Sequence, residues 1–148
     1  MIWCGEGSLR LVSINVGAVR QTGTEDQEGL RAAIGPALVQ VRRSKAGYLV
    51  GVGGTVTTLA AMDQKLVDYD PRLIHGYTLT AERIRGILCL LASLNLEERK
   101  KMPGLQAARA DIILAGVEIV LAVMEGLDIG CLVASESDLL EGLILEEF

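Results

Sequence analysis

The sequence has 148 residues, of which 50% are hydrophobic but only 3% are aromatic, and its formal net charge is −5 at pH 7. This length fits one domain with a core of aliphatic side chains, and the hydrophobic fraction excludes disorder as the main state. The acidic balance excludes general nucleic-acid binding, although a local group of N–H donors and arginines can still bind an anion.

The three cysteines, Cys4, Cys89 and Cys131, do not form a disulfide framework, because they are odd in number and far apart. With a single histidine they also give no zinc-binding spacing. We therefore expect reduced, mostly buried thiols in a cytoplasmic protein.

The most hydrophobic window, 112–134, is long enough to cross a bilayer, but three acidic residues interrupt it and Gly126 and Gly130 break it. The first residues lack a basic region followed by an apolar run. We expect neither a membrane-spanning segment nor a secretory signal.

The first part of the chain has the pattern of a hairpin followed by a helix. Strand-like segments at 1–4 and 8–16 flank the turn Gly5-Glu6-Gly7. Residues 26–43 then place apolar side chains at helical spacing, with an acidic start and a basic end that suit the helix dipole. Pro36 favours a kink in this helix.

The rest of the chain alternates strands and helices. In order, we expect a strand at 47–54, helices at 55–62 and 79–94, a short helix after Asn95, a long buried helix at 107–124, a buried strand at 129–134 and a final helix at 138–147. Thr80 is a candidate N-cap, Asn95 with Glu98 resembles a capping box, and Ser135 or Ser137 caps the last helix. This order predicts a single α/β domain with a mixed sheet flanked by helices.

The stretch "YLVGVGGTVTTLAAM", 48–62, joins an apolar strand to a small-residue helix through Gly53, Gly54 and Thr55. It matches neither the dinucleotide fingerprint nor the Walker A motif. Its glycines either present bare N–H groups to an anion at a helix N-terminus or only permit a tight connection. Thr55 is either a hydroxyl donor to such an anion or a structural N-cap.

Three further groups carry polar side chains of interest. His75, the only histidine, lies in an expected loop and is either a general base or a hydrogen-bonded structural side chain. Arg109 and Asp111 lie at the start of the expected long helix, where the dipole favours the acid and Arg109 can contact a phosphate. Glu118 and Glu125 share a helix face, but no aromatic or metal-ligand context supports paired catalytic carboxylates.

Five motifs occur in one order along the chain: "GVGGTVTTLAAM", "YDPRLIHGYTLT", "EERKKMPGL", "RADIILAG" and "LLEGLI". Together they resemble the exopolyphosphatase and guanosine pentaphosphate phosphatase (Ppx/GppA) family. The resemblance implies an actin-like, ribonuclease H-like fold of two related domains with the active site in the cleft between them. Members of the family remove terminal phosphate from polyphosphate or guanosine pentaphosphate with a divalent cation, usually magnesium.

Within that resemblance, residues 1–148 form one domain similar to the second half of the family's core. Gly53, Gly54 and Thr55 match the nucleotide-side motif, which implies that they bind a phosphate or nucleotide. His75-Gly76 and Arg109 with Asp111 match the "HG" and "RAD" signatures, and they are carried over as cleft or structural residues without an assigned chemical role. No residue is assigned as catalytic or as a metal ligand.

The sequence also departs from the family pattern, because the phosphate loops and the catalytic glutamate of the family are not found in it. The resemblance therefore implies a domain without its first strand, with magnesium ligands outside this chain. We expect the chain to be inactive alone, and to pair its open strand edges in a homo-oligomer or with a missing first domain. The alternative is a nucleotide-binding, phosphate-binding or oligomerising regulatory module without catalysis.

Overall fold

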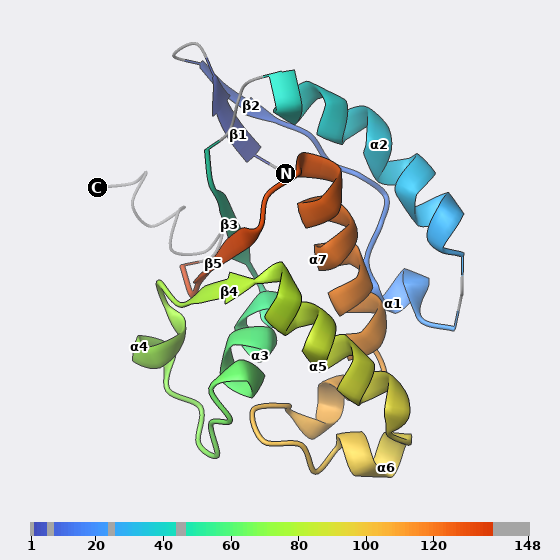
Figure 1. The fold of residues 1–148 in the computed structure, drawn as a ribbon, viewed down its shortest axis with the longest axis vertical. Helices are drawn as coiled ribbons and strands as arrows, with labels where there is room; N and C mark the ends of the chain where they lie inside the picture. Colours follow the sequence, from blue (N-terminus) through green and yellow to red (C-terminus); the bar gives the residue numbers. More distant parts are fainter. Residues whose placement is uncertain (1, 6–7, 24–25, 44–46, 138–148) are drawn as a thin grey trace.

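The computed structural model describes residues 2–5, 8–23, 26–43 and 47–137, with side chains from residue 10 onward within these ranges (Figure 1). The strands are β1 (Ile2–Gly5), β2 (Ser8–Leu11), β3 (Leu49–Val52), β4 (Thr78–Thr80) and β5 (Cys131–Ser135). The helices are α1 (Ala18–Gln21), α2 (Gln27–Arg43), α3 (Gly54–Asp63), α4 (Pro71–Ile74), α5 (Ala81–Ser93), α6 (Leu96–Arg99) and α7 (Ile113–Leu127), with a 3-10 helix at Ala107–Arg109.

Two sheets organise the described strands. β1 and β2 form the expected antiparallel hairpin, but β2 ends at Leu11 and not at residue 16 as expected. The second sheet has the order β3-β5-β4, in which β3 runs parallel to β5 and β4 runs antiparallel to it. The expected α/β class with a mixed sheet is therefore confirmed. Among the strands that the structure describes, β3 is paired on one side only, so its other edge is open.

The two faces of the second sheet differ in burial. Leu79 and Leu132, which are partners in the β4–β5 register, are both buried on the face covered by helices. On β3, Leu49 packs against the core, whereas Val50 and Val52 are 46% and 52% exposed. Side chains alternate between the faces of a strand, so the exposed valines share the opposite face.

Helix α7 contacts α2, α3 and α5, and Figure 1 shows it between α2 and α5. One core cluster joins the sheet to α3, α5 and α7, and its fully buried side chains include Leu59, Ile74, Leu79, Ile84, Leu91, Ile113, Val117, Met124 and Leu132. A second cluster joins α2 to α7 through Leu30, Ile34, Leu38, Val41, Ala122 and Leu127. The apolar spacing in 26–43 is thereby explained, because α2 buries that face on α7.

The expected helix at 79–94 was wrong at its start, because β4 occupies Thr78–Thr80 and α5 begins at Ala81. Thr80 is the N-cap as expected, since its Oγ1 accepts a hydrogen bond from the Arg83 N–H at 3.3 Å. A three-residue strand is too short to show alternation in the sequence. It forms here because Leu79 pairs in register with Leu132 of β5.

The expected long helix at 107–124 is divided. A 3-10 helix at Ala107–Arg109 and a turn precede α7, whose N-cap is Ile112. Asp111 therefore lies before α7 and not in its first turn, so the helix dipole does not account for it as expected. The two segments differ in burial: Arg109 is half-buried next to α3, whereas Ile113 is buried in the core.

The capping box is confirmed: the Asn95 side chain accepts from the Glu98 N–H at 3.0 Å, and the Glu98 carboxylate accepts from the Asn95 N–H at 2.9 Å. Helix α2 runs from Gln27 to Arg43 with Pro36 inside it. The helix expected at 138–147 lies outside the described residues.

The thiols of Cys89 and Cys131 are free, as expected, but both residues are exposed, so the expected burial was wrong for them. The Cys4 side chain lies outside the described side chains. Within the ranges that the structure describes, no helix is both long enough and apolar enough to cross a bilayer.

The loop at 100–106 is held against α3 by Gly104. Its φ angle is +79°, and a Cβ atom there would lie 2.5 Å from the backbone nitrogen of Met62. An alanine at this position would adopt a strained left-handed backbone conformation, and its Cβ would also clash with the backbone of α3. We therefore expect Gly104→Ala to lower the free energy of unfolding by about 2 kcal/mol or more, measured by urea denaturation.

Gly86, in the middle of α5, gives a matched control, since no atom lies within 4 Å of a Cβ added there. Gly86→Ala should raise the free energy of unfolding by about 0.5–1 kcal/mol through helix propensity. Equal effects of the two substitutions would contradict the assigned backbone contact.

Candidate functional site

The carboxyl ends of the parallel strands β3 and β5 meet at one edge of the sheet. β3 continues through Gly53 into α3, and β5 continues into Glu136. In open α/β sheets this edge is the usual place for a ligand.

The chain turns from β3 into α3 at Gly53, whose φ of +94° is a conformation that favours glycine. The Gly53 carbonyl accepts hydrogen bonds from the N–H groups of Val56 at 3.0 Å and Thr57 at 3.2 Å. Gly53 is the N-cap and has no side-chain cap, so of the two alternatives for Thr55 the structural N-cap was wrong. The N–H groups of Gly54 and Thr55 have no acceptor within the helix, as at every helix start.

The Thr55 side chain packs against α7. A Cβ atom added to Gly116 would lie 2.5 Å from the Thr55 hydroxyl oxygen, so only a glycine fits opposite it. Thr55 thus presents its backbone N–H at the helix start, while its side chain fixes the helix to the core.

Arg109 lies directly over the start of α3. A Cβ atom added to Gly54 would overlap the Arg109 guanidinium, which shows how closely the two groups pack. The Arg109 Nε donates to Gln106 Oε1 at 3.2 Å, which orients the side chain. The structure therefore brings together the glycine motif and the arginine, which are more than 50 residues apart in the sequence. We call the start of α3 with Arg109 the α3 anion seat.

Tyr69, in the loop between α3 and α4, lies beside this seat and donates its hydroxyl hydrogen to the Glu136 carboxylate. Partial burial first, and then the bond to Glu136, raise the pKa of Tyr69 above its usual value, while neighbouring Thr57 and Arg109 lower it less. The phenol is therefore protonated at neutral pH and continues to donate to Glu136. Neither residue was a candidate from the sequence.

His75 and Gly76 follow α4 and lie against the end of β5. The Gly76 N–H donates to the Ala134 carbonyl at 2.8 Å, and His75 Nδ1 accepts from the Glu136 N–H at 3.4 Å. His75 is exposed, and within the described residues Glu136 contacts both His75 and Tyr69. His75 therefore lies at the end of β5, next to Tyr69 and Glu136.

Asp111, by contrast, is exposed and forms no hydrogen bond or ion pair with any residue in the described ranges. The sequence motif "RAD" therefore contributes its arginine to the α3 anion seat, and the structure does not bring its aspartate there.

Glu125 is an anchor between helices. It accepts from Arg31 of α2 at 3.4 Å and from Arg85 of α5 at 3.0 Å. This explains its place on α7 without the paired-carboxylate chemistry considered with Glu118. In the part of the chain that the structure describes, no three His, Cys, Asp or Glu side chains gather as a metal site would require.

Sequence reasoning missed Tyr69 and Glu136 because they belong to irregular segments. The available signal was topological: a residue just after β5 lies beside the residues just after β3 when the two strands are parallel. In the structure, the "YDP" at 69–71 leads into α4, where Asp70 is the N-cap and accepts from the Arg72 N–H at 3.0 Å.

Comparison with known proteins gives one consistent result. The sequence model of the Ppx/GppA phosphatase family matches residues 4–148. The chain is similar to Exopolyphosphatase 2 of Mycobacterium tuberculosis, with 30% identity over 120 residues that cover 78% of this chain and 38% of that protein. It is similar to the bifunctional 3-dehydroquinate synthase/phosphatase of Fusobacterium nucleatum, with 35% identity over 99 residues that cover 66% of this chain and 14% of that protein.

The crystal structure of the Aquifex aeolicus member of the Ppx/GppA family superposes on this chain with a TM-score of 0.84 and 30% identity. The match covers 99% of this chain and 51% of that chain, so the present chain spans about half of the solved relative and less of the two other proteins. The expected actin-like fold class is confirmed by this match.

Proposed function

Because this chain belongs to the Ppx/GppA phosphatase family, we propose that it forms the phosphate-binding half of a phosphohydrolase that removes the terminal phosphate of inorganic polyphosphate or guanosine pentaphosphate. The observation that carries the proposal is the contact of the Arg109 guanidinium with Gly54 at the start of α3. It supports a seat for one phosphate group.

The chemistry of this seat is that of an anion site. The first turn of α3 supplies backbone N–H groups and the positive end of the helix dipole. Arg109 adds a full positive charge in a planar arrangement that can bind a phosphate through two hydrogen bonds. Glu136, an acid beside Tyr69, already accepts the hydrogen bond of the Tyr69 hydroxyl. A local anion site is therefore compatible with the net charge of −5.

Phosphoryl transfer depends on positioning and on charge stabilisation around the whole phosphoryl group. This chain corresponds to about half of the solved relative. We propose that the residues that orient the attacking water lie in the other half of such a cleft, outside this sequence, and that the isolated chain is inactive.

Magnesium, which the family resemblance implies, would neutralise charge on the transferred phosphoryl group. In the ranges that the structure describes, no three acidic, His or Cys side chains gather around one point, so we propose that protein ligands of the ion lie elsewhere. We therefore assign no step to the metal. We further propose a cytoplasmic location, which the unpaired thiols of Cys89 and Cys131 support.

Arg109→Ala tests the α3 anion seat. The substitution removes the charge beside Gly54, so we expect the affinity for inorganic tripolyphosphate, measured by isothermal titration calorimetry, to fall at least about tenfold. Arg42→Ala removes an exposed arginine at the end of α2 and should leave the affinity unchanged. Equal losses of affinity in the two variants would show that only the net charge matters, and would contradict the α3 anion seat.

Catalysis by the chain alone is tested by phosphate release from polyphosphate and from guanosine pentaphosphate in the presence of magnesium. We expect no release above a control without protein, because the seat binds phosphate without a group to activate water. Release that is lost in Arg109→Ala would show that the chain is active by itself and would overturn the proposed division of the site.

The alternative function is a regulatory module that binds phosphate or oligomerises without catalysis. Among the strands that the structure describes, β3 pairs with β5 alone, and this favours the alternative. The other edge of β3, next to the exposed residues Val50 and Val52, can pair with a second copy or with a separate first domain. Sedimentation equilibrium should give a homodimer that Val52→Lys dissociates. A chain that is monomeric at all concentrations would exclude self-pairing.

A further inference from the structure

We propose that Tyr69 is a positioning residue of the α3 anion seat: its hydrogen bond to Glu136 keeps this carboxylate away from Arg109, so that the guanidinium stays free for a phosphate. The inference rests on the proposed function, since it takes the seat as the place where a phosphate binds. Tyr69 then acts through Glu136 and does not need to touch the ligand.

The Arg109 guanidinium is left without an acidic partner. Its Nε donates to Gln106 Oε1 at 3.2 Å, and its two terminal nitrogens lie against Gly54. In the residues that the structure describes, no carboxylate forms an ion pair with Arg109. An arginine can bind a phosphate through two parallel N–H groups. The terminal nitrogens of Arg109 are therefore available at the start of α3.

Glu136 is an acid that could occupy this guanidinium. Tyr69 donates its hydroxyl hydrogen to the Glu136 carboxylate, and the Glu136 N–H donates to His75 Nδ1 at 3.4 Å. Both charged groups act on the same phenol: partial burial and then the bond to Glu136 raise the pKa of Tyr69, whereas the charge of Arg109 lowers it. The acid and the guanidinium therefore both lie close to the Tyr69 hydroxyl.

A second group of the same composition shows the arrangement that the seat avoids. At the C-terminal end of α3, the Tyr77 hydroxyl donates to Asp63 Oδ2 at 2.7 Å, and Arg83 donates to the same oxygen at 3.0 Å. Arg83 also donates to the Tyr77 hydroxyl at 3.3 Å. There the tyrosine, the acid and the arginine form one closed unit, in which the acid neutralises the arginine. An arginine held in this way attracts an anion less strongly.

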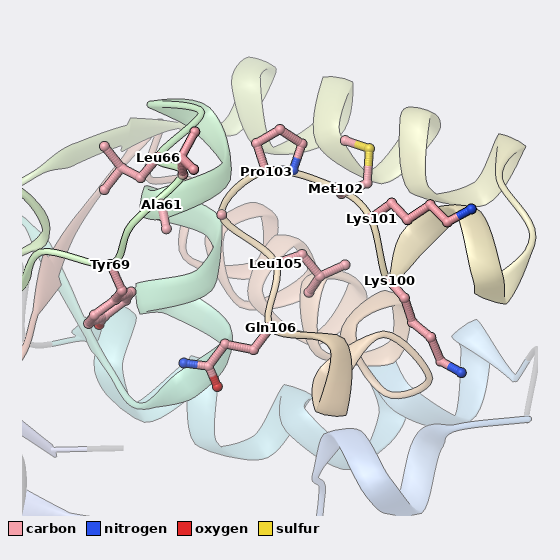
Figure 2. A pocket seen from close by; sticks show the side chains of 11 residues that line it. Ala61, Leu66, Tyr69, Lys100, Lys101, Met102, Pro103, Leu105 and Gln106 are labelled. Atoms are coloured by element: carbon pink, nitrogen blue, oxygen red, sulfur yellow. The ribbon is translucent and has the colours of Figure 1, made fainter.

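At the seat, two neutral side chains hold the charged groups apart. Gln106 binds Arg109, and Tyr69 binds Glu136. Figure 2 shows Tyr69 and Gln106 at the same end of the groove between residues 61–69 and the loop at 100–106. Glu136 is only partly buried, so its side chain can rotate when the bond from Tyr69 is lost. The carboxylate would then compete with a phosphate for Arg109.

The test is a double-mutant cycle in the full chain, with the affinity for inorganic tripolyphosphate measured by isothermal titration calorimetry. Tyr69→Phe keeps the ring and loses the hydroxyl. We expect it to weaken binding about fivefold, which corresponds to the strength of a partly exposed ion pair. In a chain that already carries Glu136→Gln, Tyr69→Phe should leave the affinity unchanged, because no carboxylate remains to be restrained. A merely structural role of Tyr69 would give the same loss in both backgrounds.

Tyr77→Phe is the matched control, since it removes a bond of the same kind at the other end of α3, where Arg83 still binds Asp63. It should bind tripolyphosphate like the unaltered chain, and far-ultraviolet circular dichroism verifies that every variant is folded. If Tyr69→Phe binds like the unaltered chain, or loses affinity equally with and without Glu136→Gln, the positioning role is wrong while the α3 anion seat stands. If the unaltered chain binds no tripolyphosphate, the seat and the positioning role both fail.

Discussion

The close packing of α3 on α7 at Gly116 is the contact on which the site depends. Because Gly116 has no side chain, the Thr55 side chain fits against α7 and fixes the first turn of α3 to the core. α7 is in turn buried against α2 and α5, and Glu125 ties it to an arginine of each. The start of α3 is therefore held by a helix that is itself buried against two others, which keeps the first N–H groups of α3 in place.

The same packing decides where the charge of Arg109 lies. The 3-10 helix that carries Arg109 comes immediately before α7. The position of α7 against α3 therefore also places Arg109 next to Gly54. The absence of a Cβ at Gly54 allows the guanidinium to approach the backbone. In a chain with a net charge of −5, an anion site requires such local concentration of positive charge.

The molecule presents two kinds of unpaired surface, with different consequences. At the end of β3, the start of α3 and Arg109 form the α3 anion seat that we propose for a phosphate group. Along β3 itself the open edge offers backbone donors and acceptors, which suit another strand. Because β3 leads directly into α3, a strand that pairs with this edge would also come close to the α3 anion seat.

The sequence by itself determined the local features whose cause lies within a few residues. These include the hairpin, the Asn95–Glu98 capping box, the Thr80 cap and the turn from β3 into α3 at the glycines, as well as the family. Only the tertiary structure decided the short strand β4, the inward direction of the Thr55 side chain and the meeting of Tyr69, Arg109 and Glu136. Each of these depends on partners tens of residues away, and a one-dimensional pattern of apolar residues does not specify which distant segments meet.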